Sequence, residues 1–227
     1  ITYLRVGQRS LKSNCQTSLT YAMPRTTRLS IYVKLGGKRR KIPLNNFDRT
    51  LNWLADTVIT DAKNILAEQD KVVTGMLQQS LQYDIVETDE GVVINYTGAV
   101  PYWDFVEQGV KGAASSNKAP NSEYQFGSGT GPKGTLRPAI RKWITDRGIS
   151  NAKWRDKSGR FLSYDAMSRR ISRSVYLTGI KPSNYYTLAI DKGWSRKTQK
   201  LSKAFGKDLQ VFLDSEFGKE YTIEIVF

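Results

Sequence analysis

The sequence has no histidine and a single cysteine, Cys15. Without histidine, the common forms of the serine or cysteine triad, the zinc hydrolase and the histidine-metal nuclease are excluded, because each needs imidazole as a base or ligand. One cysteine cannot form an intramolecular disulfide. Carboxylate chemistry is the enzymatic option that remains, and we predict a protein that is not an enzyme, with no catalytic residue, cofactor or metal site.

Long apolar runs are also missing. No stretch approaches the roughly 20 apolar residues that cross a membrane, and the amino end has no apolar core flanked by basic residues, as a secretory signal would. The sequence therefore predicts no membrane partner and no export signal. Its 39% hydrophobic and 25% charged residues are the balance of a soluble globular protein. A length of 227 residues suffices for one domain with a sizeable arm.

Acidic residues are few beside basic ones. Lys+Arg number 35 against 21 Asp+Glu, a formal net charge of +14. This excess predicts an anionic neighbour, either nucleic acid in nonspecific, salt-sensitive contact or an acidic protein or lipid surface, because charge steers association without specifying the partner. The candidate anion-facing or DNA-facing residues form two clusters: Lys38, Arg39, Arg40 and Lys41, and then Arg137, Arg141, Lys142, Lys153 and Arg155.

Alternating apolar residues predict three strand regions. Residues 29–35 alternate before Gly36-Gly37 and predict a β-hairpin with residues 38–43, whose basic run is either phosphate-facing or a solvated edge that resists wrong pairing. Residues 81–86 and 92–96 predict a second hairpin, and residues 221–227 a terminal strand. Residues 1–27 are polar without helical period and predict an extended N-terminal arm, followed by a single α+β domain over residues 28–227.

Four amphipathic stripes predict helices. The longest is capped by Asn45 or Asn46 and ends before Thr74, and two more lie between Thr135 and Gly148 and between Ser163 and Gly179. The last begins at Ser195 and ends before Gly218. Residues 111–134 predict a long loop that is functional or ordered by a partner, followed by a helical insertion over 135–180. The element order predicts helices packed on one face of a mainly antiparallel sheet.

Two short segments carry a family pattern. Thr74-Gly75-Met76-Leu77-Gln78-Gln79-Ser80-Leu81 follows the long helix as TG-x-L-x-x-S, and residues 102–109 follow the second hairpin as Y-x-x-x-V-E-x-G. Both resemble the minor tail-component family of tailed bacteriophages, whose members are tail-completion or neck proteins. Residues 136–144, 171–176 and 179–182 are similar to a helical insertion in longer members. The resemblance spans about residues 45–192, and Asn184-Tyr185-Tyr186 departs from the Pro-Phe step that often closes the family's conserved region.

The resemblance implies a structural subunit of a virion neck or tail-completion ring that joins the head or portal connector to the tail around the DNA channel. The partners it implies are six or twelve copies of the chain, the neighbouring portal, connector and tail proteins and, nonspecifically, genomic DNA. It implies assembly in the host cytoplasm and a final place in the virion. Two alternatives are a stand-alone nonspecific DNA-binding protein and a carboxylate-dependent nuclease or lyase that uses Asp104, Glu107 and a third acid.

Large apolar side chains after the second hairpin predict core packing or a subunit contact. Asp104 and Glu107, three residues apart, predict a solvated face or an inter-subunit salt bridge in preference to a cation site. The arm, the 111–134 loop and the terminal strand are expected to bind neighbouring subunits, and a head-to-tail interface whose rotation closes makes a ring. The subunit-interface candidates are Tyr102, Trp103, Phe105, Glu107, Tyr221, Ile223 and Ile225.

Overall fold

The computed structural model describes residues 29–218 except 36, 89–90, 130–133 and 151–153. The predicted arm, residues 1–27, and the predicted strand, residues 221–227, lie outside this part of the chain. Where one domain was predicted, the chain divides into two compact units. Unit 1 holds Ile59–Ala189, and unit 2 holds the described residues of Arg5–Val58 and Ile190–Phe227.

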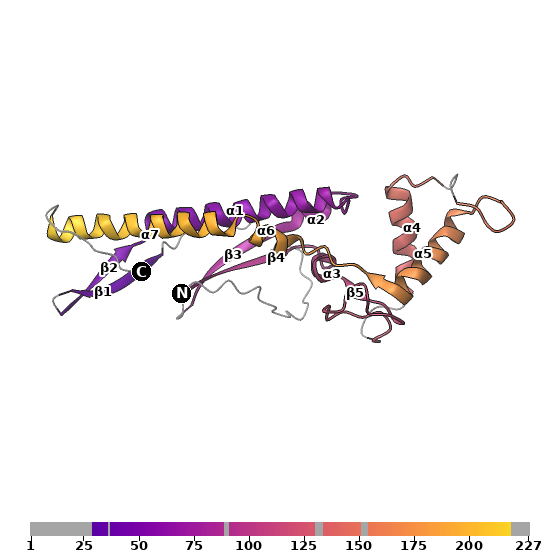
Figure 1. Cartoon of the computed structure of the whole chain (residues 1–227), viewed down its shortest axis with the longest axis horizontal. Coiled ribbons are helices and arrows are strands. Elements are labelled where there is room, and N and C mark those ends of the chain that lie inside the picture. Colours follow the sequence, from indigo (N-terminus) through magenta and orange to yellow (C-terminus); the bar gives the residue numbers. More distant parts are fainter. Residues whose placement is uncertain (1–28, 36, 89–90, 130–133, 151–153, 219–227) are drawn as a thin grey trace. The chain divides into compact units, whose positions relative to one another are not determined.

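A hairpin and two helices build unit 2 (Figure 1). β1 (Ser30–Leu35) pairs antiparallel with β2 (Lys38–Pro43). Ile31 lies opposite Ile42, which is fully buried, while the exposed Tyr32 lies opposite the exposed Lys41. Side chains alternate across the two faces of a strand, so one face packs inward and the other faces solvent. The predicted first hairpin is confirmed.

The two helices of unit 2 run antiparallel. Asn45 and Asn46, one of which was predicted to cap the helix, both lie within α1 (Asn45–Glu68), whose residues up to Val58 belong to this unit. α7 (Trp194–Phe217) starts one residue before the predicted Ser195 and ends before Gly218. Phe47 meets Phe205 edge to face at 6.1 Å between ring centroids, and the Lys200 ammonium lies 3.9 Å from the Trp53 ring centroid. Later residues of α1 thus contact earlier residues of α7.

α1 ends at Glu68, before Thr74 as the periodicity predicted. Asp70 has a positive φ of 54° and follows the last helical turn. The Lys71 N–H donates to Leu66 O at 2.9 Å and the Asp70 N–H donates to Ala67 O at 3.0 Å. This is a Schellman motif with aspartate where glycine is usual, and it satisfies carbonyls that the helix end leaves open.

Unit 1 contains the predicted second hairpin. β3 (Leu81–Thr88) pairs antiparallel with β4 (Gly91–Gly98), with Ile85 opposite Ile94 and both buried. Short helices that the periodicity did not predict precede and follow it: α2 (Met76–Ser80), α3 (Trp103–Gln108) and α6 (Tyr185–Asp191). The Tyr186 ring packs on Tyr96 at 5.4 Å, and its hydroxyl donates to Thr97 O at 2.6 Å. α6 is thereby anchored to the hairpin.

α4 (Leu136–Asp146) and α5 (Tyr164–Thr178) form a helical hairpin within unit 1. Ile144, Leu162 and Met167 make its small buried cluster. The Ser163 side chain accepts from the Ala166 N–H at 3.2 Å, which confirms the predicted N-cap. Gly179 ends α5, as the sequence predicted.

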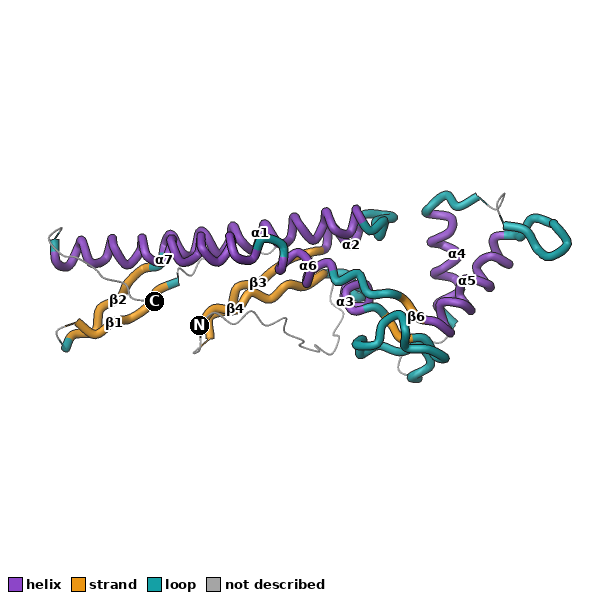
Figure 2. Tube along the Cα trace, viewed as in Figure 1, coloured by secondary structure: helices purple, strands orange, loops and turns teal. Residues whose placement is uncertain are grey.

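The loop between β5 (Val110–Lys111) and α4 is ordered by its own unit over residues 112–129 (Figure 2). The Ala113 and Ala114 N–H groups donate to Tyr176 O and Leu177 O at the end of α5. The Ser122 hydroxyl donates to Gly109 O at 2.7 Å. We expected a loop that was functional or ordered by a partner, and the structure shows that contacts within the chain hold this stretch.

The α+β class is confirmed, with antiparallel strands. In the described part of the chain the strands form three separate two-stranded ladders, β1–β2, β3–β4 and β5–β6, the last with β6 (Gly179–Ile180). Each ladder therefore has two outer edges without a strand partner among those residues. None of the helices in the same part is long and apolar enough to cross a membrane.

Candidate interaction surfaces

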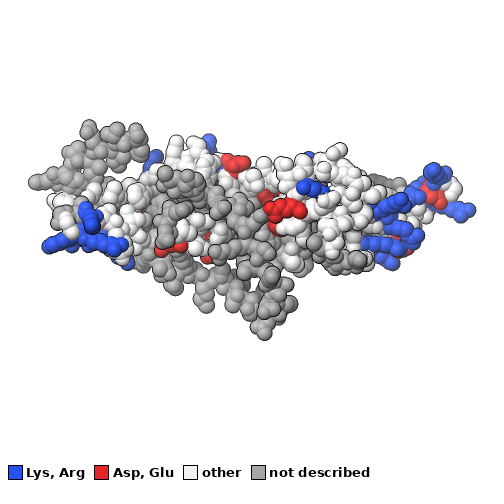
Figure 3. All heavy atoms as spheres, turned by 90° about the horizontal axis from the view of Figure 1, so that it is seen from below, with Lys and Arg blue, Asp and Glu red and all other residues white. Residues whose placement is uncertain are grey.

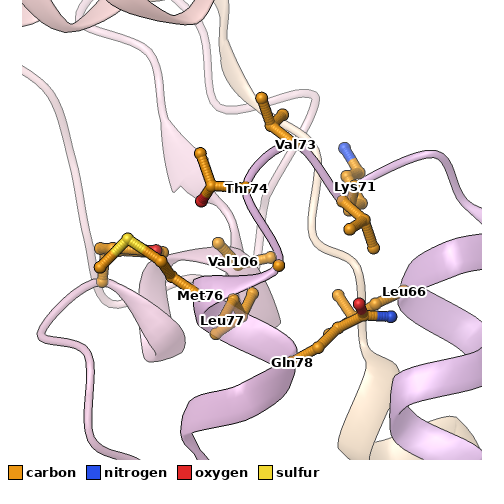
Figure 4. A pocket seen from close by; sticks show the side chains of 11 residues that line it. Leu66, Lys71, Val73, Thr74, Met76, Leu77, Gln78 and Val106 are labelled. Atoms are coloured by element: carbon orange, nitrogen blue, oxygen red, sulfur yellow. The ribbon is translucent and has the colours of Figure 1, made fainter. Parts of the chain in front are cut away.

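The two segments that carry the family pattern meet in space. Residues 74–78 and residues Tyr102 and Val106 line one surface hollow of unit 1, together with the end of α1 and the turn after it (Figure 4). The hollow contains no carboxylate, and Lys71 is its one charged side chain. Its lining residues are Leu66, Lys71, Val72, Val73, Thr74, Gly75, Met76, Leu77, Gln78, Tyr102 and Val106.

Gly75 shapes one wall of the hollow. It lies before α2 with φ 74° and ψ −5°, a left-handed conformation that glycine adopts without steric cost. The turn lets α2 begin at once, so that Leu77 is buried while Met76 stays 56% exposed. The Gln78 amide donates to Lys63 O at 2.8 Å and ties α2 to α1. The glycine of the first segment thus places Met76 at the mouth of the hollow.

α3 contributes Val106 to the lining, and Tyr102 lies directly before this helix. A Cβ at Gly98 would lie 2.6 Å from Trp103 Cβ, so glycine is needed for the indole to pack there. Trp103 meets Tyr186 edge to face at 6.2 Å and belongs to the interior packing of unit 1. Tyr102 and Phe105, both interface candidates, are about two-fifths exposed. Tyr102 lines the hollow, while Phe105 packs against Tyr124 at 4.4 Å.

Glu107 is buried, with 7% of its surface exposed. Its carboxylate accepts from the Tyr186 N–H at 3.0 Å, the Thr187 N–H at 3.1 Å and the Thr187 hydroxyl at 2.9 Å. These donors belong to the first turn of α6, where a negative charge is favourable. The prediction that Glu107 lies on a solvated face or in an inter-subunit salt bridge is therefore wrong. Its carboxylate caps the start of α6 within the fold.

Asp104 does not share a site with Glu107. Its carboxylate accepts from the Tyr124 hydroxyl and, at 2.7 Å, from the Gln108 amide. Burial, and then the hydrogen bond and charge of Asp104, raise the pKa of Tyr124 well above its usual range, so the phenol remains a donor. No group of three metal-ligating side chains occurs among the residues that the structure describes.

The first basic cluster is divided between the two faces of its hairpin. Arg40 reaches Glu216 of α7 at 3.4 Å. On the other face lie Tyr32, Lys34, Arg39 and Lys41, which we call the basic ribbon, and all four are exposed. The Arg39 guanidinium lies 4.3 Å from the Tyr32 ring centroid. Figure 3 shows lysine and arginine side chains gathered over this hairpin.

The second basic cluster lies on the α4–α5 hairpin, where Figure 3 also shows gathered cations. Asp165 attracts three of them: the nitrogens of Arg137, Arg169 and Arg141 lie 2.5, 3.1 and 3.8 Å from its oxygens. The hydrogen bond from Arg137 is the main reason that the pKa of Asp165 is lowered. One carboxylate thus lies beside three guanidinium groups and offsets part of their positive charge.

Two more of the predicted residues of this cluster, Lys142 and Arg155, also have partners, while Lys153 lies outside the described residues. Lys142 pairs with Asp146 at 2.7 Å, and Arg147 pairs with Asp70. The Arg155 guanidinium lies 4.2 Å from the Phe161 ring centroid and donates to Gly159 O. The interface candidates Tyr221, Ile223 and Ile225 lie outside the described part as well.

Met76 and Tyr32 are surface residues that sequence reasoning did not select. Met76 stands at a variable position of the first segment, and only its neighbour Leu77 follows the apolar period. Tyr32 carried a readable signal, since it alternates with Ile31 and Val33 and so had to face outward.

Comparisons with protein families, curated proteins and solved structures found no match to the chain.

Proposed function

We propose that this chain is a non-enzymatic structural subunit of a tailed-phage neck or tail-completion ring. One observation carries the proposal: the two segments that resemble the tail-component family line the same hollow, although a hairpin separates them in sequence. If the two segments served folding alone, they would not both need to border one open surface. We assign this hollow to a contact with a neighbouring copy of the chain.

The chemistry of the hollow suits a protein neighbour. Met76 is 56% exposed and Tyr102 is 40% exposed, and both present apolar surface at the opening. Methionine adapts its shape to an incoming side chain, and tyrosine supplies apolar area together with a hydroxyl. Val72, Val73 and Leu77 continue the apolar lining inward. An exposed apolar surface with few charges is typical of protein interfaces.

Strand edges without a partner strand among the described residues support the same assignment. β3 and β4 are each eight residues long and make a two-stranded ladder, which gains stability when a further strand pairs with its edge. If the hollow of one copy binds a different surface of the next copy, the contact is head-to-tail, and it makes a ring when its rotation closes. The family resemblance supports six or twelve copies around the DNA channel of a virion, between the portal or connector and the tail.

The carboxylates that an enzyme would need have other partners. Glu107 holds the first turn of α6, and Asp104 accepts from Tyr124 and Gln108. A metal-dependent nuclease would need both acids turned toward a shared site. Their engagement within the fold favours assembly over hydrolysis as the use of this region.

The test is the mass of the purified full chain under native conditions, with electron microscopy of the same sample. The wild-type protein should form closed rings, and Met76→Glu should release monomers, because the new charge would be desolvated in the contact. Gln79→Glu is the matched control, since it places the same side chain on the exposed surface of α2 outside the hollow. A monomeric wild-type protein, or equal dissociation of both variants, would contradict the proposal.

A stand-alone nonspecific DNA-binding protein is the second candidate. The observation that favours it is the basic ribbon, whose Lys34, Arg39 and Lys41 have no acidic partner within 4.0 Å among the described residues. The same native-mass measurement separates the candidates. A monomer that binds duplex DNA supports the second candidate, whereas a ring supports the first.

A further inference from the structure

We propose that the basic ribbon, Tyr32, Lys34, Arg39 and Lys41 on the outward face of the β1–β2 hairpin, contacts the phosphate backbone of double-stranded DNA. The proposal goes beyond the ring, since it assigns a ligand to a surface in unit 2 that is separate from the hollow in unit 1. It also selects one of the two basic clusters that the sequence could not rank.

The register of the hairpin places the three cations on one face. Lys34 lies directly opposite Arg39, and Lys41 lies two residues beyond Arg39 on the same strand. Opposite residues and residues two apart share a face, with spacings of about 5 Å across and about 7 Å along the strand. The cations therefore form a compact array, and Arg39 is held over the Tyr32 ring at 4.3 Å.

This array opposes the stability of its own hairpin. Like charges directly opposite each other are unfavourable in a two-stranded ladder. Arg40 shows the alternative, because it projects to the other face and pairs with Glu216 at 3.4 Å. No such partner lies beside Lys34, Arg39 or Lys41 in the described part of the chain. A polyanion bound to the face would remove the repulsion.

The α4–α5 hairpin has more basic residues, but most of those that the sequence selected lie beside carboxylates. Arg137, Arg141 and Arg169 surround Asp165, while Lys142 and Arg147 pair with Asp146 and Asp70. A phosphate at these side chains would have to compete with the carboxylates. At the basic ribbon no described carboxylate lies within 4.0 Å of the three cations. The strand register, in addition, holds these cations on one face, and for both reasons we select the β1–β2 hairpin as the anion-binding surface.

Duplex DNA fits the ribbon better than an acidic protein does. The centre of a protein interface is apolar and poor in lysine, whereas three of the four ribbon residues are cations and the Arg39 guanidinium lies 4.3 Å from the ring centroid of the fourth, Tyr32. A two-stranded ribbon has the width that the major groove admits, and cations along it meet successive phosphates. The ribbon offers three lysine or arginine contacts to phosphate and no asparagine or glutamine side chain for paired hydrogen bonds to a base. The binding should therefore be nonspecific and salt-sensitive.

The experiment measures the affinity of the full chain for a short mixed-sequence duplex over a range of salt concentrations. The wild-type protein should bind, and the triple variant Lys34→Gln, Arg39→Gln, Lys41→Gln should bind at least about tenfold more weakly at low salt. Its slope of log affinity against log salt should be shallower by almost three, at about 0.9 per lost phosphate contact. Thermal unfolding of this variant should occur no earlier than in the wild type, because repulsion has been removed.

The matched control removes three exposed cations from unit 1, in the variant Lys157→Gln, Arg160→Gln, Arg173→Gln. It should retain most of the affinity and slope. Equal losses in both variants would show that net charge alone acts and would overturn the proposal. Poly-glutamate is the second probe: affinity equal to that for DNA would assign the face to an acidic protein and overturn it too. Native mass measured on the same samples reports on the ring separately, so either proposal can fail alone.

Discussion

Asp208, on α7, accepts a hydrogen bond from the backbone N–H of Phe47, 161 residues earlier, at 2.8 Å. The same carboxylate accepts from the Asn46 N–H at 3.0 Å and from the Asn46 side-chain amide at 2.8 Å. α1 thus receives its N-terminal cap from another helix, and Asp208 is only 4% exposed. A buried negative charge at this helix end satisfies open donors and opposes the positive end of the helix dipole.

Asp208→Ala should destabilise unit 2 by about 2–3 kcal/mol, since three donors lose a charged acceptor away from water. The measurement is the free energy of unfolding in urea, with amide hydrogen exchange of residues 45–50 as the local readout. Asp191→Ala is the control, because this aspartate is exposed. Faster exchange in the first turn of α1 is expected in the first variant alone.

Glu107→Ala should destabilise unit 1 by about 2–4 kcal/mol, because the buried N–H group of Tyr186 and the N–H group of Thr187 would lose their charged acceptor. Glu107→Gln retains one acceptor oxygen and should cost less. Glu123→Ala, at an exposed glutamate, should change the unfolding free energy by no more than about 0.5 kcal/mol. A value for Glu107→Ala as small as that of the control would refute the capping role.

Gly112→Ala should destabilise unit 1 by more than about 2 kcal/mol, because the new methyl group would overlap the carbonyl of Leu177 at the end of α5. Gly206→Ala is the matched change in the interior of α7, where nothing lies within 4 Å of the added Cβ. It should stabilise unit 2 by about 0.5–1 kcal/mol through helix propensity. Opposite shifts of the two melting temperatures are therefore expected from the same chemical substitution.

The α4–α5 hairpin should lose stability in acid through Asp165. Arg137 lowers the pKa of this carboxyl in the folded protein, so the contribution is present above the unfolded value, about 3.9, and disappears as the pH falls through the folded value. Asp165→Asn should lower the melting temperature at neutral pH and have little effect in strong acid. Asp191→Asn should have little effect at either pH, and a constant difference for Asp165→Asn would contradict the assignment.

Local periodicity predicted the long elements correctly. The stripe from Phe47 to Leu66 and the cap at Ser163 predicted α1 and α5, and alternation around Ile85 and Ile94 predicted a hairpin. The short helices α2, α3 and α6 were missed, because five to seven residues cannot display a helical period. The strands were predicted to form one sheet, whereas the described strands form three separate ladders. Local periodicity cannot show this, since strand pairing depends on which edges meet in space.

The sequence by itself determined the types of the long elements, the α+β class, the excess of positive charge and the absence of imidazole chemistry, because each depends on residues close along the chain or on composition. Only the tertiary structure decided which charges are compensated: Asp165 engages three arginines, Glu107 and Asp208 cap helices from a distance, and Lys34, Arg39 and Lys41 remain exposed. The physical reason is that ion pairs and hydrogen bonds act over a few ångströms, and those separations are set by packing between segments far apart in sequence.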